Sequence, residues 1–319
     1  MKGSVKISVQ AKRIRFDFTI RRNLTIVRGD SATGKTTLVD MIRQYVDNPS
    51  GSPVTVISDV PCAVLEGSLW KATLSGISGS IVFIDEGNDF VSSVDFARAI
   101  AATDNYYVII TRESLPALPY SVEEIYGIHY SGRYGSLRQE YNEFYRIYGD
   151  TTLFKTGNRA RQVITEDSNS GYQFFSAICK SNGMTCTSAS GKSNIFKLAS
   201  KATDNTVIIA DGAAFGPEMN RIDKLLKANK RLSLYLPESF EWLILKASVF
   251  TGKELRTMLE DPSDFIESRL YFSWERYFTD YLIRISADGY LAYSKKDLNP
   301  NYLNESVLEK ILQALPIKL

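Results

Sequence analysis

The sequence has one histidine, His129, and three cysteines, Cys62, Cys179 and Cys186, among its 319 residues. A single histidine argues against a histidine-rich metal site and against a Ser-His-Asp triad. The cysteine number is odd and the spacings are not those of zinc sites, so a disulfide framework is not expected either. Because the segment 1–22 is charged and strand-like rather than a secretion signal, we expect a reducing, cytoplasmic location.

Long apolar runs are also absent. No stretch reaches the roughly 18 residues that a membrane-spanning helix needs, so no membrane association is expected. Neither sign of charge is in large excess: the net charge of +2 and the pI of about 8.2 neither require nor exclude nucleic acid. The remaining composition, 44% hydrophobic and 23% charged residues, is typical of a globular protein long enough for two domains.

Apolar periodicity predicts alternating strands and helices in the first half of the chain. Strands are expected at Val5–Gln10, Arg13–Ile20, Leu24–Val27, Val54–Ile57, Ser80–Asp85 and Tyr106–Thr111, and helices at Thr36–Tyr45 and Val94–Thr103. Such alternation favours a mostly parallel sheet with helices on its faces. We therefore expect an α/β domain over residues 1–150.

A phosphate-binding loop is predicted by the run Gly29-Asp30-Ser31-Ala32-Thr33-Gly34-Lys35-Thr36, followed by Thr37. The run lies between an expected strand and an expected helix, which is the context in which this P-loop pattern binds nucleotide. Backbone N–H groups and the helix N-terminus would hold the phosphates. Lys35 would reach the β- and γ-phosphates, and the Thr36 hydroxyl would bind Mg²⁺. The sequence thus predicts ATP and Mg²⁺ as cofactors; a chance glycine-rich turn is the alternative.

Two further strand ends carry polar residues that complement this loop. Asp85 and Glu86 follow the apolar run Ile81–Ile84 and resemble the Walker B motif of P-loop ATPases. That resemblance implies that Asp85 holds Mg²⁺ through water and that Glu86 polarises the attacking water. Arg112 follows the strand Tyr106–Ile110, where ABC-type ATPases sense the γ-phosphate; it contacts phosphate or is an ordinary cation at a strand end.

The first domain departs from ABC-type ATPases in two respects. Leu74-Ser75-Gly76 superficially resembles their signature motif, but it precedes Asp85 so closely that no helix fits between them. No convincing glutamine loop separates Thr37 from Asp85. The domain therefore resembles a reduced ABC-like or AAA-like P-loop ATPase, and a composite ABC-type site is not expected.

The alternation restarts after a region rich in Tyr, Gly and Arg, and the domain boundary is placed at Gly149–Gly157. Strands are expected at Gln162–Glu166, Met184–Ser188, Thr206–Asp211 and Leu232–Leu236, helices at Ser170–Ser181, Lys192–Ala202 and Met219–Asn229, and mainly helices from Pro237 onward. The sequence predicts a second, smaller α/β domain over residues 158–319, with a helical C-terminal extension.

The polar residues of this second half resemble those of a Toprim domain, the metal-binding fold of topoisomerases, primases and nucleases of the overcoming-lysogenization-defect (OLD) family. Glu166 corresponds to the family's glutamate after the first strand, and Asp211 to the first acid of its Asp-x-Asp after the third. The second acid is replaced by Ala213, and Glu238 or Glu241 is the candidate substitute. The resemblance implies that Glu166 and Asp211 share Mg²⁺ and act in phosphodiester cleavage. Strands of other parallel sheets also end in acids, which is the alternative.

The segment Tyr126–Tyr148 interleaves aromatic and basic residues, namely Tyr130, Tyr134, Tyr141, Tyr145, Arg133, Arg138 and Arg146. It either stacks on nucleic-acid bases or forms an amphipathic helix that packs the two domains together, and packing is the preferred interpretation.

An ATPase domain followed by a Toprim-like domain resembles the arrangement in OLD-family nucleases and related phage-defence proteins. The leading hypothesis is an ATP-controlled, Mg²⁺-dependent nuclease in nucleic-acid processing or phage defence. The rival is a regulatory NTPase whose second domain is inactive and binds a partner; a transporter ATPase is disfavoured. DNA, RNA, another protein and a second copy of this chain remain open as partners.

Overall fold

The computed structural model describes residues 1–29, 34–130, 140–149 and 160–317. The chain forms two units: the first holds Met1–Gly149 and Asp261–Phe272, and the second holds Asp150–Glu260 and Ser273–Leu319. The sequence predicted two contiguous domains, the second of them smaller. The units instead have similar lengths, and the second unit is interrupted by a segment that packs with the first.

Hydrogen bonds explain why Asp261–Phe272 belongs to the first unit. Gly3 N donates to Ser263 O at 2.7 Å, and Ser268 N donates to Met1 O at 2.9 Å. The N-terminal ammonium of Met1 also pairs with the carboxylate of Glu267. These partners lie far apart in the sequence, so a local pattern gives no sign of them.

Apart from the helix over Tyr126–Tyr148, the strands and helices predicted for the first 150 residues are present, with small shifts at their ends. The strands are β1 (Val5–Gln10), β2 (Ile14–Ile20), β3 (Leu24–Val27), β4 (Thr55–Ser58), β5 (Cys62–Val64), β6 (Ile81–Ile84), β7 (Tyr106–Ile110), β8 (Ile125–Tyr130) and β9 (Glu140–Arg146). The helices are α1 (Lys35–Asp47), α2 (Trp70–Ser75) and α3 (Val94–Ala101), with 3-10 turns η1 (Asp89–Ser92), η2 (Val122–Glu124) and η3 (Pro262–Asp264). The short elements β5 and α2 were not predicted, and neither were the strands β8 and β9.

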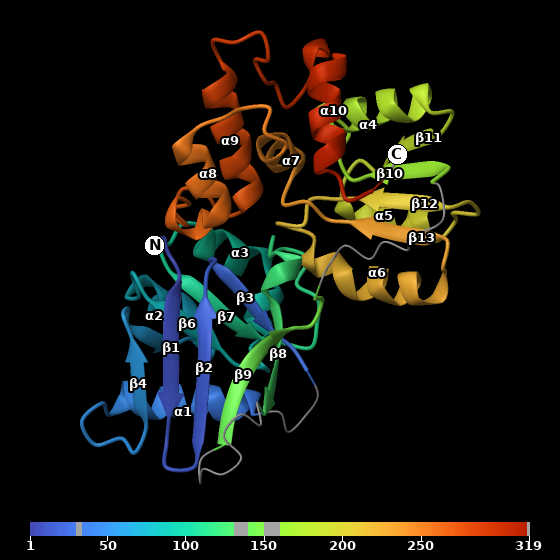
Figure 1. Ribbon diagram of the computed structural model, residues 1–319. Coiled ribbons are helices and arrows are strands. Elements are labelled where there is room, and N and C mark those ends of the chain that lie inside the picture. Colours follow the sequence, from blue (N-terminus) through green and yellow to red (C-terminus); the bar gives the residue numbers. More distant parts are fainter. Residues whose placement is uncertain (30–33, 131–139, 150–159, 318–319) are drawn as a thin grey trace. The chain divides into compact units, whose positions relative to one another are not determined.

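The described strands of the first unit form one mixed sheet in the order β4-β1-β2-β9-β8-β3-β7-β6-β5 (Figure 1). The run from β8 through β3, β7 and β6 to β5 is parallel, while β1 pairs antiparallel with both β2 and β4. β8 and β9 pair antiparallel, so the predicted amphipathic helix over Tyr126–Tyr148 is wrong. Strand pairing with β2 and β3 decides this region, and Arg133, Tyr134 and Arg138 lie outside the described residues.

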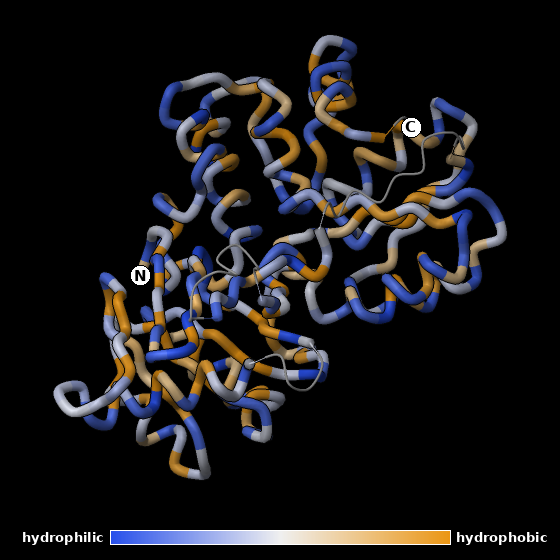
Figure 2. The backbone as a smooth tube through the Cα atoms, turned by 60° about the horizontal axis from the view of Figure 1, so that its bottom comes forward, coloured by the Kyte–Doolittle hydropathy of each residue, from blue (hydrophilic) through white to orange (hydrophobic). Residues whose placement is uncertain are grey.

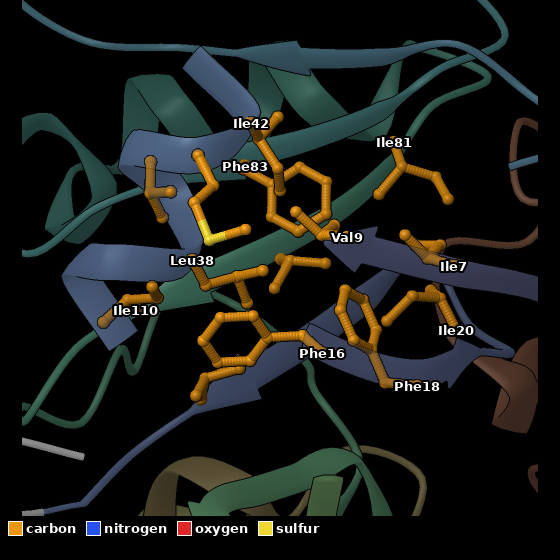
Figure 3. Close-up of a cluster of buried hydrophobic side chains, with 14 of the residues drawn as sticks. Ile7, Val9, Phe16, Phe18, Ile20, Leu38, Ile42, Ile81, Phe83 and Ile110 are labelled. Atoms are coloured by element: carbon orange, nitrogen blue, oxygen red, sulfur yellow. The ribbon is translucent and has the colours of Figure 1, made fainter. Parts of the chain in front are cut away.

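Helix α1 packs against strands from both ends of this sheet, because β4, β1 and β5 all contact it. The sheet therefore curls around the helix. Leu38 and Ile42 of α1 meet Val9 of β1 and Phe83 of β6 in one buried cluster (Figure 3). Burial of these apolar side chains is the main stabilising contribution here, at about 25 cal/mol per Å² removed from water.

The opposite face of the parallel strands is covered by α2, η1 and α3. Side chains of β7 alternate between the two faces: Val108 joins the α1 cluster, whereas Tyr107 contacts Phe96 of α3 edge to face. Trp70 of α2 stacks on Phe90 of η1 at a ring separation of 5.1 Å. The parallel strands are thus buried on both sides, which explains their continuous apolar character.

The second unit is a three-layer α/β arrangement. Its strands are β10 (Gln162–Thr165), β11 (Thr185–Ser188), β12 (Thr206–Ile209) and β13 (Leu232–Tyr235). Its helices are α4 (Ser170–Ser181), α5 (Lys192–Ala199), α6 (Gly216–Ala228), α7 (Phe240–Lys246), α8 (Lys253–Glu260), α9 (Trp274–Ser286) and α10 (Glu305–Ala314), with the 3-10 turn η4 (Pro300–Leu303). The strands and helices predicted for this half are confirmed, including the helical C-terminal part.

The described strands of this unit are all parallel, in the order β11-β10-β12-β13. From β10 the chain moves through α4 to one side, and from β12 it moves through α6 to the other. Right-handed crossovers then require α4 on one face of the sheet and α5 and α6 on the opposite face (Figure 1). A crevice is expected where neighbouring strands send their chains in opposite directions, at the carboxyl ends of β10 and β12.

Apolar residues gather on the strands of both units, while the outer turns are hydrophilic (Figure 2). Among the helices in the described residues, none combines the length and apolar character required to cross a membrane.

Candidate functional site

The two glycines of the predicted phosphate loop, Gly29 and Gly34, have backbone angles that favour glycine. Gly29 has φ 140° and Gly34 has φ 83°, both in the region that residues with a side chain rarely adopt. Gly34 lies directly before α1, and a Cβ on it would approach the Phe16 ring at 3.4 Å. Asp30, Ser31, Ala32 and Thr33 lie outside the described residues.

Lys35, the first residue of α1, is buried and turns back toward the start of the loop. Its Nζ donates a hydrogen bond to Gly29 O at 2.9 Å. Thr36 and Thr37, next along the helix, are exposed. A buried ammonium held beside a helix N-terminus is the arrangement that an incoming phosphate group would meet.

The Asp85–Glu86 and Thr111–Arg112 pairs lie at the same sheet edge as this loop. β7 lies between β3 and β6, and all three strands are parallel. Thr111 N donates to Val27 O at 3.2 Å, which continues the β3–β7 ladder up to the start of the phosphate loop. The topology therefore brings together three polar segments that are far apart in the sequence.

Asp85 and Glu86 have different surroundings at this edge. Asp85 is partly buried, and burial raises its pKa, while the backbone N–H of Glu86 donates to Asp85 Oδ1 at 2.8 Å and opposes that rise. Glu86 is more exposed and forms an ion pair with Arg112, with 2.9 Å between Oε1 and Nε. Arg112 thus lies within reach of the residue that the sequence assigns to water activation.

A buried arginine that the sequence analysis did not single out braces the loop. Arg28 Nη2 donates to Tyr120 Oη at 2.8 Å and to Glu113 O at 3.0 Å, and its guanidinium lies over the Tyr120 ring. Arg28 N also donates to Tyr126 O at 2.7 Å. These bonds fix the residue before Gly29 to the segment that follows Arg112. An arginine between a buried strand and the first loop glycine was the available signal.

In the second unit, Glu166 and Asp211 lie side by side at the predicted crevice. Glu166 directly follows Thr165 of β10, and Asp211 lies two residues after Ile209, the partner of Thr165 on the neighbouring parallel strand β12. Asp211 N donates to Glu166 Oε2 at 3.1 Å. Because an aspartate oxygen lies within about 5 Å of its own backbone N, the two carboxylates are at most about 8 Å apart.

Both carboxylates are hard to ionise in this place. Burial raises the pKa of Glu166 to about 7, against the opposing bond from Asp211 N. Burial also raises the pKa of Asp211 well above its ordinary value, and the charges of Glu275 and Glu166 raise it further. Apolar walls from Phe175, Phe240 and Leu243 line the small pocket beside them, which accounts for the desolvation.

The neighbouring Asp167 has a structural role. Its Oδ1 accepts from Asn169 N at 3.0 Å and its Oδ2 accepts from Gly171 N at 2.8 Å, so it holds the N-terminus of α4. A Cβ at Gly171 would come within 2.8 Å of Asp167 Oδ2. Asp167 is therefore committed to the turn that places Glu166.

Two further acids, Glu241 of α7 and Glu275 of α9, complete the negative charge around Asp211. Glu241 is buried and accepts a hydrogen bond from Tyr293 Oη at 2.7 Å. Glu238, the other candidate for the missing acid, accepts a backbone hydrogen bond from Ala213 N at 3.3 Å through its carbonyl oxygen. No motif pointed to Glu275, because only the packing of α9 against α7 brings it here.

Two lysines face the same four acids. Lys295 Nζ lies 2.6 Å from Glu275 Oε1 and 3.7 Å from Glu241 Oε1. Lys192 Nζ is tied to Ala214 O at 2.8 Å, and its charge acts on Glu166. The site is therefore a mixed cluster of four carboxylates and two ammonium groups.

The oxygen donors of this cluster suit Mg²⁺ by their chemistry. The four acids are not arranged around a common metal position. No three His, Cys, Asp or Glu side chains are placed to hold a metal ion in residues 1–29, 34–130, 140–149 and 160–317. Glu166 and Asp211 fit as two ligands, while Glu241 and Glu275 are engaged by Tyr293 and Lys295.

Comparisons of this chain with protein-family models, with curated proteins and with solved structures find no match.

Proposed function

We propose that this protein is an ATP-binding and ATP-hydrolysing enzyme whose first unit controls a Toprim-like, Mg²⁺-dependent nuclease in the second. The observation that carries the proposal is the order β3-β7-β6 at one parallel edge. It sets the phosphate loop, Arg112 and the Asp85–Glu86 pair next to one another, as ATP hydrolysis requires.

Within this proposal, Lys35 would supply the positive charge at the β- and γ-phosphates, and Thr36 and Asp85 would hold Mg²⁺. The ion would contribute charge stabilisation at the phosphate oxygens. Glu86 would orient and polarise the attacking water. Its ion pair with Arg112 suggests a sequence of events: the γ-phosphate attracts Arg112, and Glu86 is released to face the water.

The second unit supports the nuclease half of the proposal through Glu166 and Asp211. Both would bind Mg²⁺, and Glu241, whose charge acts on Asp211, would replace the acid missing at Ala213. A phosphodiester of DNA or RNA would be the substrate, and the biological role would be nucleic-acid processing or phage defence. The free cysteines of the described residues suit the cytoplasmic location that the proposal includes.

The alternative is a regulatory NTPase switch whose second unit is catalytically inactive and binds a protein partner or a second copy of the chain. Ala213 at the position of the second acid favours it, since an alanine provides no metal ligand. So does the engagement of Glu241 and Glu275 with Tyr293 and Lys295.

A paired assay separates these functions. Phosphate release from ATP is measured alongside cleavage of labelled DNA and RNA, with Mg²⁺ or Mn²⁺ and with or without ATP. Metal-dependent cleavage that Glu166→Ala abolishes supports the nuclease. ATP hydrolysis without any cleavage supports the regulatory alternative, and no ATP binding at all refutes both.

A further inference from the structure

Lys295 is the strongest remaining feature of the carboxylate site. It follows α9, and its ammonium lies against Glu275 and Glu241 at 2.6 and 3.7 Å. Burial alone would lower the pKa of Lys295, but the charges of Glu241 and Glu275 raise it overall. Lys295 therefore carries its positive charge.

The backbone around Lys295 is fixed, so its approach to the acids is built into the fold. Ser170 N donates to Lys295 O at 3.1 Å, which ties this segment to the start of α4. The Gln173 side chain donates to Lys296 O at 3.2 Å and accepts from Leu298 N at 2.7 Å. The backbone of Lys295 is therefore held in place, and movement of its ammonium depends on the flexible four-carbon side chain.

The two lysines of the site differ in that freedom. Both lysines are half-buried, but Lys192 Nζ is bound to a backbone carbonyl, Ala214 O, at 2.8 Å. The Lys295 side chain retains 38% exposure and has open solvent beside it. Lys295 is thus the cation that can leave the acids without opening the core.

We propose that Lys295 is an internal cation that stands in for the divalent metal, neutralising Glu241 and Glu275 until Mg²⁺ displaces it. The inference rests on the metal site of the proposed function and adds its regulation: metal binds only when it outcompetes a tethered ammonium. It also explains why no three acids are arranged around a metal within the described part of the chain, since Lys295 holds two of them.

Calorimetric titration of Mn²⁺ into the full chain, without nucleotide, tests the proposal. Omitting nucleotide removes the phosphate oxygens that the first unit needs to bind metal. Lys295→Met removes the charge and keeps the length, and it should tighten Mn²⁺ binding. Two unit charges about 4 Å apart correspond to about 1,000-fold at an effective dielectric constant near 20, and screening by water at the half-exposed lysine reduces the expected gain to about 10- to 100-fold. Lys295→Arg keeps the charge and should stay within threefold of the wild type.

Two controls make the change specific. Lys296→Met removes a charge from the adjacent exposed residue and should leave Mn²⁺ affinity unchanged. Adding Glu166→Ala to Lys295→Met should abolish the tight binding that was gained. A second measurement serves if Lys295→Met does not fold: in the wild type, saturating Mn²⁺ should speed acetylation of Lys295 severalfold relative to Lys296, read by peptide mass spectrometry.

The outcomes separate this inference from the proposed function. Equal Mn²⁺ affinity in the wild type and Lys295→Met overturns the inference, and any metal-dependent cleavage by the wild type then leaves the nuclease proposal standing. Tighter binding in Lys295→Met without cleavage by either protein upholds the inference and refutes the nuclease. Unchanged Lys295 acetylation at saturating Mn²⁺ also overturns it.

Discussion

Lys35→Met is expected to remove most ATP binding while the first unit stays folded. Methionine keeps an apolar chain of similar length in a position where the lysine is only 6% exposed, and it removes the ammonium. The substitution therefore separates the charge of Lys35 from its packing. The Lys35 side chain has two roles that this substitution separates: its apolar stem is buried at the start of α1, and its ammonium donates a hydrogen bond to Gly29 O.

The effect on folding should be small. The bond from Lys35 Nζ to Gly29 O is charge-assisted, and such bonds contribute about 1.5–3 kcal/mol. Removing the Lys35 ammonium from water costs free energy that opposes this contribution. The two terms offset each other, so the free energy of unfolding should change by no more than about 1 kcal/mol.

The effect on ATP should be large. At about 4 Å and an effective dielectric constant near 20, an ammonium and one phosphate charge attract by about 4 kcal/mol. Desolvation of both groups reduces the net contribution to about 2–3 kcal/mol. Because 1.4 kcal/mol corresponds to a factor of ten, the dissociation constant for ATP should rise about 30- to 100-fold.

Calorimetry with ATP and Mg²⁺ measures the affinity, and thermal unfolding measures the stability. Lys12→Met is the matched control, since Lys12 is an exposed lysine of the same unit in the turn between β1 and β2. It should change neither quantity. An ATP affinity that is equal in the wild type and in Lys35→Met would show that this glycine loop does not bind phosphate.

Three other substitutions test other parts of the reasoning. Glu86→Gln should keep ATP bound but slow phosphate release about 100-fold or more, because it removes the charge that polarises water; hydrolysis at the wild-type rate would exclude that role. Glu166→Ala should abolish metal-dependent cleavage of DNA or RNA while the ATP dissociation constant stays the same, and persistent cleavage would place the active site elsewhere. Glu124→Gln tests the effect of burial, which raises the pKa of Glu124 to about 7 from its ordinary value of about 4.5. Between these two pH values the folded state holds a proton that the unfolded state has lost. Glu124 therefore makes the free energy of unfolding fall as the pH rises through this window. The variant should gain on the order of 3 kcal/mol relative to the wild type between pH 4.5 and 7, measured by urea unfolding, whereas a pH-independent difference would contradict the raised pKa.

Local patterns in the sequence determined most of the secondary structure. Alternation over Val5–Gln10 predicted β1 at its observed bounds, and helical spacing over Ser170–Ser181 did the same for α4. The glycines of the predicted phosphate loop were recognisable by their spacing, and the backbone angles of Gly29 and Gly34 favour that residue type. Such features depend on neighbours within one or two turns, and the sequence presents those neighbours directly.

Prediction was wrong where long-range pairing outweighs local character. The tyrosines and arginines of Tyr126–Tyr148 are compatible with a helix, but β8 pairs with β3 and β9 with β2. The segment Asp261–Phe272 gave no sign of its place in the first unit, because its hydrogen-bond partners include Met1 and Gly3.

The candidate sites divide in the same way. The sequence by itself predicted Lys35, Glu166 and Asp211 as candidates, since Lys35 belongs to a motif and the two acids come after buried strands. Only the tertiary structure added Glu275 and Lys295, which come from α9 and the segment after it. Parallel strands align their carboxyl ends whatever lies between them, so residues at strand ends can be anticipated. Which side chains a distant helix brings to that edge depends on how the helix packs, and no local sequence pattern predicts that packing.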